Sequence, residues 1–446
     1  MVKVITYGTY DLFHYGHQRL LERAKALGDY LIVGVTAEDF DKARGKINVE
    51  QSLMERIEAV KKSGLADEVI VEEYEGQKID DIQRYDVDIF AIGSDWKGKF
   101  DYLNEYCKVV YLDRTQGVSS TELRSERNTV KLGMIGRHIS IGKYASETNY
   151  VNGLELTSVV AEEKEAFKDL FPNFSSIVDN YDEMLQKVDA VYIASHPSQH
   201  YKHIRQALLM NKHVLCEAPM ALSVEQFEEI QNLSKQRGLV LMDAIKAAYS
   251  MAYNRLILLL KGGKIGRIVS VDSICTSLRI TEKDTNNLSG KWNSICEWGP
   301  TAMLPIFQLL GHDYKSKIIT SSFIDREQQF DLFTKISFVY KHAVASIKVG
   351  KGVKSEGELI ISGTEGYVYI PAPWWKTDYF EIRYEDSNKN RRYFYQLDGE
   401  GIRYELVSFV KAIESGKMSH YIQNETTKAT VSVMEDFYNN KDLVEI

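Results

Sequence analysis

Apolar and polar positions follow two different periods along this 446-residue chain. Near the N-terminus, residues 4–7 form an apolar run that predicts a buried strand, and residues 18–24 have the spacing of an amphipathic helix. Farther on, strand-like and helix-like segments alternate: strands at 130–136, 154–161, 189–195 and 213–216, and helices at 140–150, 163–169, 198–210 and 223–237. Strands separated by helices of this length predict a parallel, doubly wound sheet.

The pattern changes after about residue 265, where long segments alternate apolar and polar positions with the period of a strand. These segments are 268–278, 335–349, 356–361 and 366–370, followed by helical patterns at 402–415 and 425–439. They predict a large, mostly antiparallel sheet with one face exposed to solvent or covered by a partner. We therefore expect an α/β chain with domains at 1–128, 129–250 and 251–446, the last of α+β type.

Bulk composition narrows the class of protein. Apolar residues make up 44% of the chain and charged residues 26%, values that are typical of a soluble globular protein. The net charge of −8 disfavours a general nucleic-acid surface. No apolar run approaches the ~20 residues of a membrane span, and the N-terminus enters a strand without a signal-peptide pattern. Four scattered cysteines, without metal or disulfide spacing, favour a reducing cytoplasm: Cys107, Cys216, Cys275 and Cys296.

The segment GTYDLFHYGH, residues 8–17, carries the clearest candidate chemistry. It places His14 and His17 between a predicted strand and a predicted helix, where free backbone N–H groups and the helix dipole favour an anion. Gly8 and Gly16 have no Cβ, so the backbone can approach a ligand closely. Two imidazoles, a glycine-lined turn and a helix N-terminus together predict a phosphate site.

This segment resembles the HxGH signature of the cytidylyltransferases. Residues 114–121, RTQGVSST, resemble the RTxGxST motif of the same family, and residues 93–100, GSDWKGKF, resemble the segment that closes its nucleotide pocket. The three motifs occur in the family's order and spacing and cover nearly all of residues 1–128. The resemblance is strongest to the glycerol-3-phosphate cytidylyltransferases of teichoic-acid synthesis, and it implies a Rossmann-like nucleotidyltransferase domain.

The resemblance implies in-line attack of a substrate phosphate on the α-phosphorus of CTP, with pyrophosphate as the leaving group. His14 and His17 would donate hydrogen bonds to the triphosphate, Lys46 and Arg114 would add positive charge, and Mg²⁺ would bridge phosphate oxygens. Asp11 is the candidate that organises the metal or a lysine. The residues expected to contact the nucleotide are Gly8, Thr9, Tyr10, Asp11, Gly16, Asp95, Trp96, Thr115, Gly117, Ser119 and Thr121.

The expected acceptor site departs from the family in two places. Arg44 stands where relatives tend to carry a lysine, and Gly64 stands where they carry a second basic residue. Arg56 matches a family arginine that contacts the acceptor phosphate. These departures leave the acceptor open among glycerol phosphate, glycerol 2-phosphate and a longer alditol phosphate.

The remainder, about 130–446, resembles the Gfo/Idh/MocA oxidoreductases, in which an NAD(P)-binding Rossmann domain precedes an α/β domain with a large open sheet. The segments that carry this resemblance are 194–200, 216–219, 266–268 and 399–405. Three positions depart from the family. His138 replaces the second fingerprint glycine, Ala218 replaces the lysine of the Glu-Lys-Pro motif, and Thr301 falls in the later acid/base region.

Two interpretations of this half stay open. In one, it has lost dehydrogenase activity and serves as a scaffold, dimerisation element or substrate-binding body. In the other, it still moves hydride with NAD(H) or NADP(H), Lys246, His196 and Glu297 replace the missing groups, and Glu162 binds the ribose. The full candidate set is Gly136, Glu162, His196, Glu217, Lys246 and Glu297. Three members have structural alternatives: Lys246 as a helix-surface charge, His196 as a residue that satisfies a loop, and Glu297 as a cap or ion pair.

The leading hypothesis is a CTP-dependent cytidylyltransferase that makes a CDP-polyol for a cell-surface polymer. A bifunctional enzyme that also reduces a small ketose or aldehyde is the second hypothesis. A non-catalytic nucleotide-sensing or assembly protein is the third. We expect a homodimer, because both resembled families associate and an open sheet offers a broad face.

Overall fold

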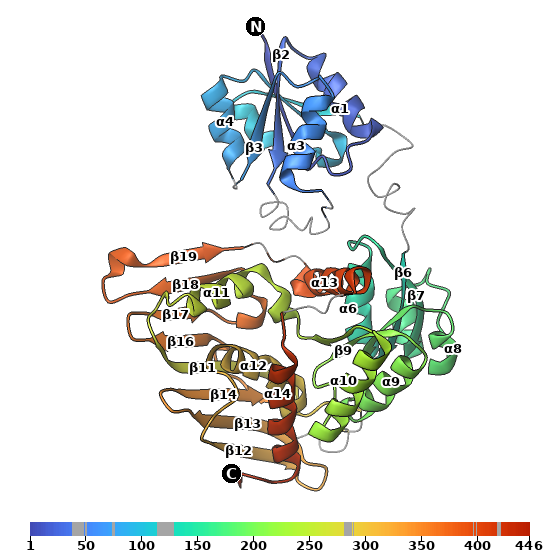
Figure 1. The fold of residues 1–446 in the computed structure, drawn as a ribbon, viewed down its shortest axis with the longest axis vertical. Coiled ribbons are helices and arrows are strands. Elements are labelled where there is room, and N and C mark those ends of the chain that lie inside the picture. Colours follow the sequence, from blue (N-terminus) through green and yellow to red (C-terminus); the bar gives the residue numbers. More distant parts are fainter. Residues whose placement is uncertain are drawn as a thin grey trace. The chain divides into compact units, whose positions relative to one another are not determined.

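The computed structural model describes residues 1–37, 49, 51–73, 76–113, 129–280, 288, 290–395, 397, 399–416 and 421–446. The chain divides into two compact units, Met1–Thr129 and Val130–Ile446. Each unit has its own sheets and its own covering helices (Figure 1). Within the described residues, none of the helices combines the length and the apolar character that a bilayer span needs.

Unit 1 is built on a parallel sheet with the strand order β3-β2-β1-β4-β5 among the described residues. Its strands are β1 (Lys3–Gly8), β2 (Tyr30–Thr36), β3 (Glu68–Glu72), β4 (Ile89–Gly93) and β5 (Lys108–Leu112). Its helices include α1 (Tyr15–Lys25), α3 (Leu53–Lys62) and α4 (Gln77–Tyr85). Because β1 lies between β2 and β4, the strand order reverses beside β1, and ligands bind at such a point beyond the carboxyl ends of the strands.

The first half of unit 2 repeats this design with the order β10-β9-β8-β6-β7, again all parallel. The strands are β6 (Val130–Gly136), β7 (Leu154–Ala161), β8 (Ala190–Ala194), β9 (His213–Glu217) and β10 (Leu241–Ala244). The helices are α6 (His138–Thr148), α7 (Lys164–Leu170), α8 (Tyr181–Leu185), α9 (Pro197–Leu209) and α10 (Val224–Arg237). Here the order reverses at β6, so the equivalent crevice opens at Gly136.

The second half of unit 2 is a large mixed sheet with the order β19-β18-β17-β16-β11-β14-β13-β12-β20, and β15 pairs with β11. Its longer strands are β11 (Ile268–Leu278), β12 (Ser316–Asp325), β13 (Phe330–Val339) and β14 (Val344–Gly350). The shorter ones are β15 (Gly352–Val353), β16 (Leu359–Gly363), β17 (Tyr367–Ile370), β18 (Tyr379–Arg383), β19 (Arg391–Phe394) and β20 (Leu443–Glu445). Most neighbours are antiparallel, whereas β11–β14 and β12–β20 are parallel.

Four helices cover or flank this sheet in Figure 1: α11 (Met251–Lys261), α12 (Ser294–Leu310), α13 (Ile402–Ser415) and α14 (Asn424–Tyr438). Helix α12 packs on β11, β13 and β14, and most of its residues are buried. Helix α14 contacts both α12 and α10, and its Val431 belongs to the core of the parallel sheet. The two halves of unit 2 therefore share one continuous packed interior.

The predicted α/β class, with parallel Rossmann-like sheets and a larger mixed sheet, is confirmed. The predicted bounds at 130–136, 154–161, 268–278 and 402–415 agree with β6, β7, β11 and α13. The single strand predicted at 335–349 is wrong. It is a hairpin of β13 and β14, in which the exposed pair Lys341-His342 forms a turn closed by the Tyr340 N–H and the Ala343 carbonyl, 2.9 Å apart.

Candidate functional site

The turn between β1 and α1 sets the two signature histidines side by side. His14 has extended backbone angles (φ −131°, ψ 175°) and is the N-cap of α1. Its Nδ1 accepts a hydrogen bond from the Gly16 N–H at 3.0 Å, and His17 Nδ1 accepts one from the His14 N–H at 3.4 Å. This reciprocal arrangement is a capping box in which imidazoles replace the usual hydroxyl and carboxylate.

The capping geometry fixes which ring nitrogen of each histidine donates. The two rings stack with centroids 3.9 Å apart and planes 21° apart. Because each Nδ1 accepts a backbone N–H, each neutral ring carries its proton on Nε2. Two imidazole N–H donors thus lie together at a helix N-terminus, which is the geometry that an anion site requires.

Tyr10 supports His17 from the protein interior. It has a left-handed φ of 53°. Its side chain is 1% exposed, and its ring meets the His17 ring edge-on at 5.5 Å. A Cβ at position 8 would lie 3.0 Å from the Tyr10 ring, so the packing of this ring is what requires Gly8. The side chain of Tyr10 therefore positions the site and is too deeply buried for direct contact with a nucleotide.

The residues that precede and open α3 hold the same turn from the other side. The Gln51 N–H donates to Asp11 Oδ1 at 3.0 Å, and the Gln51 side-chain oxygen accepts from the Leu12 N–H at 2.8 Å. Arg56 is fully buried and donates to the carbonyls of Thr9 and Thr36, each at 2.8 Å. These contacts fix a turn in which Leu12 also has a left-handed φ, 48°.

The residues after β4 lie at the carboxyl end of the same sheet as the β1–α1 turn. The chain turns at Gly93 into the short 3₁₀ segment Ser94–Trp96. The Trp96 ring packs against Phe100 with centroids 5.8 Å apart, and the Lys99 ammonium lies 5.2 Å from the Trp96 centroid. An aromatic face next to a cation suits a nucleotide base and its phosphates.

In unit 2, the turn after β6 has the strained glycine of a dinucleotide fold. Gly136 has φ +141°, and a Cβ there would lie 2.2 Å from the carbonyl carbon of Ala194. Helix α6 begins directly at His138, whose Nδ1 lies 2.7 Å from a Glu163 carboxylate oxygen. The His138 N–H donates to the same oxygen at 3.4 Å. A carboxylate therefore stands at the N-terminus of α6, where a dinucleotide would place its diphosphate.

Trp292 covers this turn from the second half of unit 2. The Arg137 guanidinium lies 4.9 Å from the Trp292 centroid. Arg137 Nε is buried and has no hydrogen-bond partner among the described residues. The Trp292 carbonyl accepts from the buried ammonium of Lys351 at 2.6 Å. The Trp292 ring and the side chains of Arg137 and Lys351 therefore lie together at the turn between β6 and α6.

Two buried tyrosine–carboxyl pairs lie at the junction of the halves of unit 2. The Tyr192 hydroxyl donates to Glu217 at 2.6 Å, the Tyr144 hydroxyl donates to Glu405 at 2.7 Å, and the two rings stack 3.8 Å apart. Burial raises the pKa of both carboxyl groups, and the nearby Glu217 carboxylate raises the pKa of Glu405 further. Burial also raises the pKa of Asp243 to about 7, against a smaller lowering by its hydrogen bond from Thr427.

Residues 5–126 match the family described as cytidylyltransferase-like, and residues 130–244 match the oxidoreductase family with an NAD-binding Rossmann fold. The glycerol-3-phosphate cytidylyltransferase of Bacillus spizizenii is 54% identical over 126 residues, which are 28% of this chain and 97% of that protein. The Bacillus subtilis enzyme of the same name is 47% identical over 131 residues, with coverages of 28% and 97%. This chain belongs to the cytidylyltransferase-like family.

The second unit is similar to oxidoreductases of known structure. A 3-ketoreductase from Actinomadura kijaniata, solved with NADP and TDP-benzene, has a TM-score of 0.62 and 18% identity, covering 72% of this chain and 100% of that one. Glucose-6-phosphate 3-dehydrogenase of Bacillus subtilis is 25% identical over 201 residues, 43% of this chain and 56% of that protein. At this identity the structural likeness shows the fold alone. Both predicted family resemblances are confirmed.

Several predicted site residues of this cytidylyltransferase-like chain lie outside the described residues, so their roles stay predictions. They are Arg44, Lys46, Arg114, Thr115, Gly117, Ser119 and Thr121, and the side chain of Asp95 also lies outside the description. The helix predicted at 122–128 falls in the same part of the chain. Asp11 is 3% exposed and bonded to Gln51. Its assignment to a metal also stays a prediction.

The candidate residues of the second unit separate into different contacts. His196 is the N-cap of α9, where its Nδ1 accepts from the Ser198 N–H, and burial lowers its pKa. Glu297 lies between Arg279 at 2.5 Å and Lys351 at 2.6 Å. These contacts are compatible with a structural role for each residue, and their catalytic assignments stay predictions. Glu162, predicted to bind a ribose, is exposed just after β7.

Sequence reasoning missed the residues that position the site without touching a ligand. Gln51 precedes a capping box formed by Ser52 and Glu55, and that pattern was the available signal for a helix start beside the site. Tyr144, Tyr192, Glu405 and Asp243 gave no signal, because each is an ordinary residue in a strand or helix until the fold brings them together.

Proposed function

We propose that this chain transfers a cytidylyl group from CTP to the phosphate of a polyol and releases pyrophosphate. The observation that carries the proposal is the stacked His14–His17 pair, whose Nε2 donors lie together at the N-terminus of α1. The relatives named glycerol-3-phosphate cytidylyltransferase match unit 1 at nearly full length. That match favours glycerol phosphate or a related alditol phosphate as the acceptor.

In the proposed reaction, an oxygen of the acceptor phosphate attacks the α-phosphorus, and the bond from that phosphorus to the bridging oxygen breaks. Negative charge moves toward the departing pyrophosphate, so donors that strengthen their hydrogen bonds there accelerate the step. His14 and His17 fill this role, and their capping bonds hold the rings without reorganisation. Mg²⁺ would neutralise charge on the triphosphate, since such ions bind substrate phosphates together with waters and one or two carboxylates.

The identity of the acceptor is the least constrained part of the proposal. Arg56 is fully buried among backbone carbonyls, so contact with the acceptor stays a prediction. Gly64 has φ +68° at the end of α3, where a glycine favours the helix-ending turn. A position without a cation there is compatible with glycerol 2-phosphate or a longer alditol phosphate. The product would be a CDP-polyol for a cell-surface polymer.

Pyrophosphate release tests the proposal. We expect CTP, Mg²⁺ and one member of a panel of polyol phosphates to give steady release. Replacing His17 by Ala should lower turnover by at least ~100-fold, as loss of an oxyanion-hole donor does. His312→Ala is the matched control, because this exposed histidine lies in unit 2. No release with any acceptor would support the nucleotide-sensing alternative instead.

We further infer that unit 2 does not transfer hydride in its present form. At the turn that would hold the diphosphate, His138 replaces glycine and engages the Glu163 carboxylate, which would repel a phosphate. Ala218 and Thr301, where the resembled oxidoreductases carry the motif lysine and the later acid/base group, have no group that exchanges a proton near neutral pH. These residues do not fit the dinucleotide.

Cofactor binding distinguishes this inference from a bifunctional enzyme. Titration of the full chain with NADH and NADPH, followed by nicotinamide fluorescence, should show no saturable binding at micromolar concentrations. Absorbance at the nicotinamide band should stay constant with small ketoses and aldehydes present. Saturable binding with turnover would establish the bifunctional alternative and leave the cytidylyltransferase proposal unaffected.

A further inference from the structure

Three lysine side chains of unit 2 converge on a single carboxylate. The Nζ atoms of Lys376, Lys246 and Lys143 lie 2.6, 2.9 and 3.3 Å from the oxygens of Glu400. The lysines come from separate parts of the unit: α6, the 3₁₀ segment Lys246–Tyr249 and the 3₁₀ segment Trp374–Lys376. Only the tertiary fold brings these ammonium groups to one point.

The loop that presents Glu400 is held in a strained form. Gly399, Glu400 and Gly401 have consecutive left-handed φ angles of 56°, 55° and 89°. A Cβ at position 399 would lie 2.1 Å from a Glu147 carboxylate oxygen, so the loop is wedged against α6. A non-glycine residue kept in this region costs roughly 1–3 kcal/mol and often marks a functional position. Here the three ion pairs oppose that cost and hold the Glu400 carboxylate among the lysines.

The cluster carries an excess of positive charge that solvent can reach. Its three ammonium groups and one carboxylate leave a net charge of +2. The side chains of Lys143, Lys376 and Lys246 are 52%, 33% and 24% exposed. Burial raises the pKa of Glu400, but hydrogen bonds from Lys376 and Lys246 outweigh it and lower that pKa to about 2. The carboxylate is therefore ionised at neutral pH. Burial lowers the pKa of Lys246, and the hydrogen bond to Glu400 opposes that lowering.

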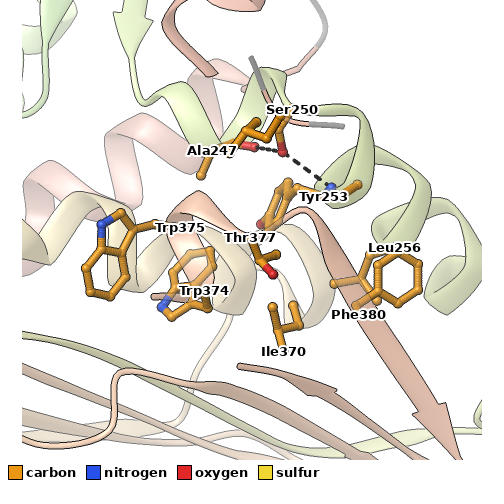
Figure 2. Close-up of a pocket in the computed structure, with 11 residues that line it drawn as sticks. Ala247, Ser250, Tyr253, Leu256, Ile370, Trp374, Trp375, Thr377 and Phe380 are labelled. Carbon is orange, nitrogen blue, oxygen red and sulfur yellow. Dashed lines mark hydrogen bonds between the residues drawn. The ribbon is translucent and has the colours of Figure 1, made fainter. Parts of the chain in front are cut away.

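An aromatic pocket begins one residue away from two of these lysines. Ala247, which follows Lys246, and Trp375, which precedes Lys376, both line it. Figure 2 shows Trp374, Trp375 and Tyr253 on its sides, with the Thr377 hydroxyl between them. The Ser250 hydroxyl donates to the Ala247 carbonyl at 3.0 Å, which fixes the turn between Lys246 and α11. An indole ring that is adjacent in the chain to an ammonium-bearing residue is compatible with a polyhydroxylated carbon chain that ends in a phosphate.

We propose that Lys143, Lys246 and Lys376 form a binding site for the phosphate of a small phosphorylated polyol or sugar, whose carbon chain lies against Trp375. A phosphate monoester carries a charge of about −1.5 to −2 at neutral pH, which matches the excess of the cluster. Glu400 holds the ammonium groups together before the ligand arrives and then shares them with it. The site adds a ligand to unit 2 and does not depend on nucleotide chemistry in unit 1.

Lysine footprinting on the full chain tests whether a phosphate ligand binds at these three lysines. The chain is acetylated at limiting reagent, with and without glycerol phosphate, and modification of each lysine is read by mass spectrometry. Glycerol phosphate should reduce acetylation of Lys143, Lys246 and Lys376 at least ~3-fold, because a bound anion restrains and shields their ammonium groups. Lys389, which is 71% exposed and pairs only loosely with Asp386 at 4.0 Å, should be unaffected.

Two variants separate ligand binding from a structural ion-pair network. Lys376→Gln should raise the half-protecting concentration of glycerol phosphate ~10-fold, whereas Glu400→Gln should lower it, because the charge excess rises by one. Lys389→Gln is the matched control and should leave it unchanged. Sodium sulfate at the same ionic strength should protect less than glycerol phosphate. Equal protection by the two anions, no protection, or weaker binding by Glu400→Gln would overturn the proposal.

Discussion

At the scale of single residues, the imidazole of His14 combines two roles. Its Nδ1 caps α1 by accepting from the Gly16 N–H, so the neutral ring carries its proton on Nε2, the donor that the proposed phosphate site uses. Capping contributes to folding, whereas the Nε2 donor contributes to the transition state. A side chain that caps α1 but has no donor equivalent to Nε2 can therefore separate capping from catalysis.

Replacing His14 by Asn and by Ala should give different patterns. Asn is a good N-cap, so His14→Asn should stay within about 0.5 kcal/mol of the parent in unfolding free energy, whereas His14→Ala should lose about 1 kcal/mol. Both should lower turnover at least ~100-fold, because neither has the Nε2 donor. Urea denaturation and pyrophosphate release measure the two quantities. Full turnover in the Asn variant would remove His14 from the chemistry.

Asp243 is a residue whose environment makes folding depend on pH. It is 5% exposed, and its Oδ1 has no hydrogen-bond partner among the described residues. Its pKa of about 7 in the fold lies above the ordinary aspartate value. The folded chain therefore holds this proton more tightly than the unfolded chain. The contribution of Asp243 to the free energy of unfolding is most favourable below pH 4. That contribution is lost as pH rises from about 4 to about 7.

The pH dependence should disappear when Asp243 is replaced by Asn, which keeps an acceptor for Thr427 and does not titrate. The unfolding free energy of the parent minus that of Asp243→Asn should fall by up to about 4 kcal/mol between pH 4 and pH 7, and stay level above. Urea denaturation of both proteins at several pH values gives this difference directly. A difference that does not vary with pH would contradict the assignment.

At the scale of elements, α3 acts as the clamp on the β1–α1 turn. Gln51, just before its N-cap, satisfies both the Leu12 N–H and the Asp11 carboxylate. A turn with two left-handed non-glycine residues, Tyr10 and Leu12, needs such external support. The placement of His14 and His17 therefore depends on a helix more than thirty residues later in the chain.

Gln51→Met should loosen this clamp while keeping the side-chain length. The Leu12 N–H loses its acceptor, so the turn should order only when CTP binds, and KM for CTP should rise ~5-fold, equivalent to the roughly 1 kcal/mol of one hydrogen bond. The turnover number should change less than KM. Gln83→Met, at an exposed position on α4, provides the control. An equal KM for CTP in both variants would contradict the inference that Gln51 holds the β1–α1 turn in its binding conformation.

At the scale of the whole molecule, the chain contains two units with separate cores. The curated relative from Bacillus spizizenii is matched over 97% of its length by 126 residues of this chain. A protein of about that length therefore folds without the second unit. The two units should accordingly unfold as separate cooperative transitions.

Calorimetry of the full chain should show two transitions, and CTP with Mg²⁺ should raise the temperature of only one. At a hundredfold excess over Kd, the stabilisation is about 2.7 kcal/mol, which shifts a domain of this size by several degrees. A fragment of residues 1–129 should retain the CTP-sensitive transition and turnover within about threefold. One transition that shifts as a whole would show that the units are thermodynamically coupled.

Local chemistry along the sequence predicted the elements and the phosphate site. The strand and helix around residues 8–17 follow from short-range pattern, whereas the stacking of the imidazoles and the φ of Gly136 are seen only in the structure. The wrong strand at 335–349 shows the limit of such reasoning. Alternation continues through a hairpin, and only two exposed polar residues mark the turn there.

The sequence by itself determined the α/β class, the two families and the position of the histidine pair, because these depend on residues close together in the chain. Tertiary structure alone decided that Glu163 stands against His138, that Gln51 clamps the turn, and that Lys143, Lys246 and Lys376 meet at Glu400. Such contacts join residues tens to hundreds of positions apart. Their energies depend on distance and burial, which the order of residues does not specify until the chain has folded.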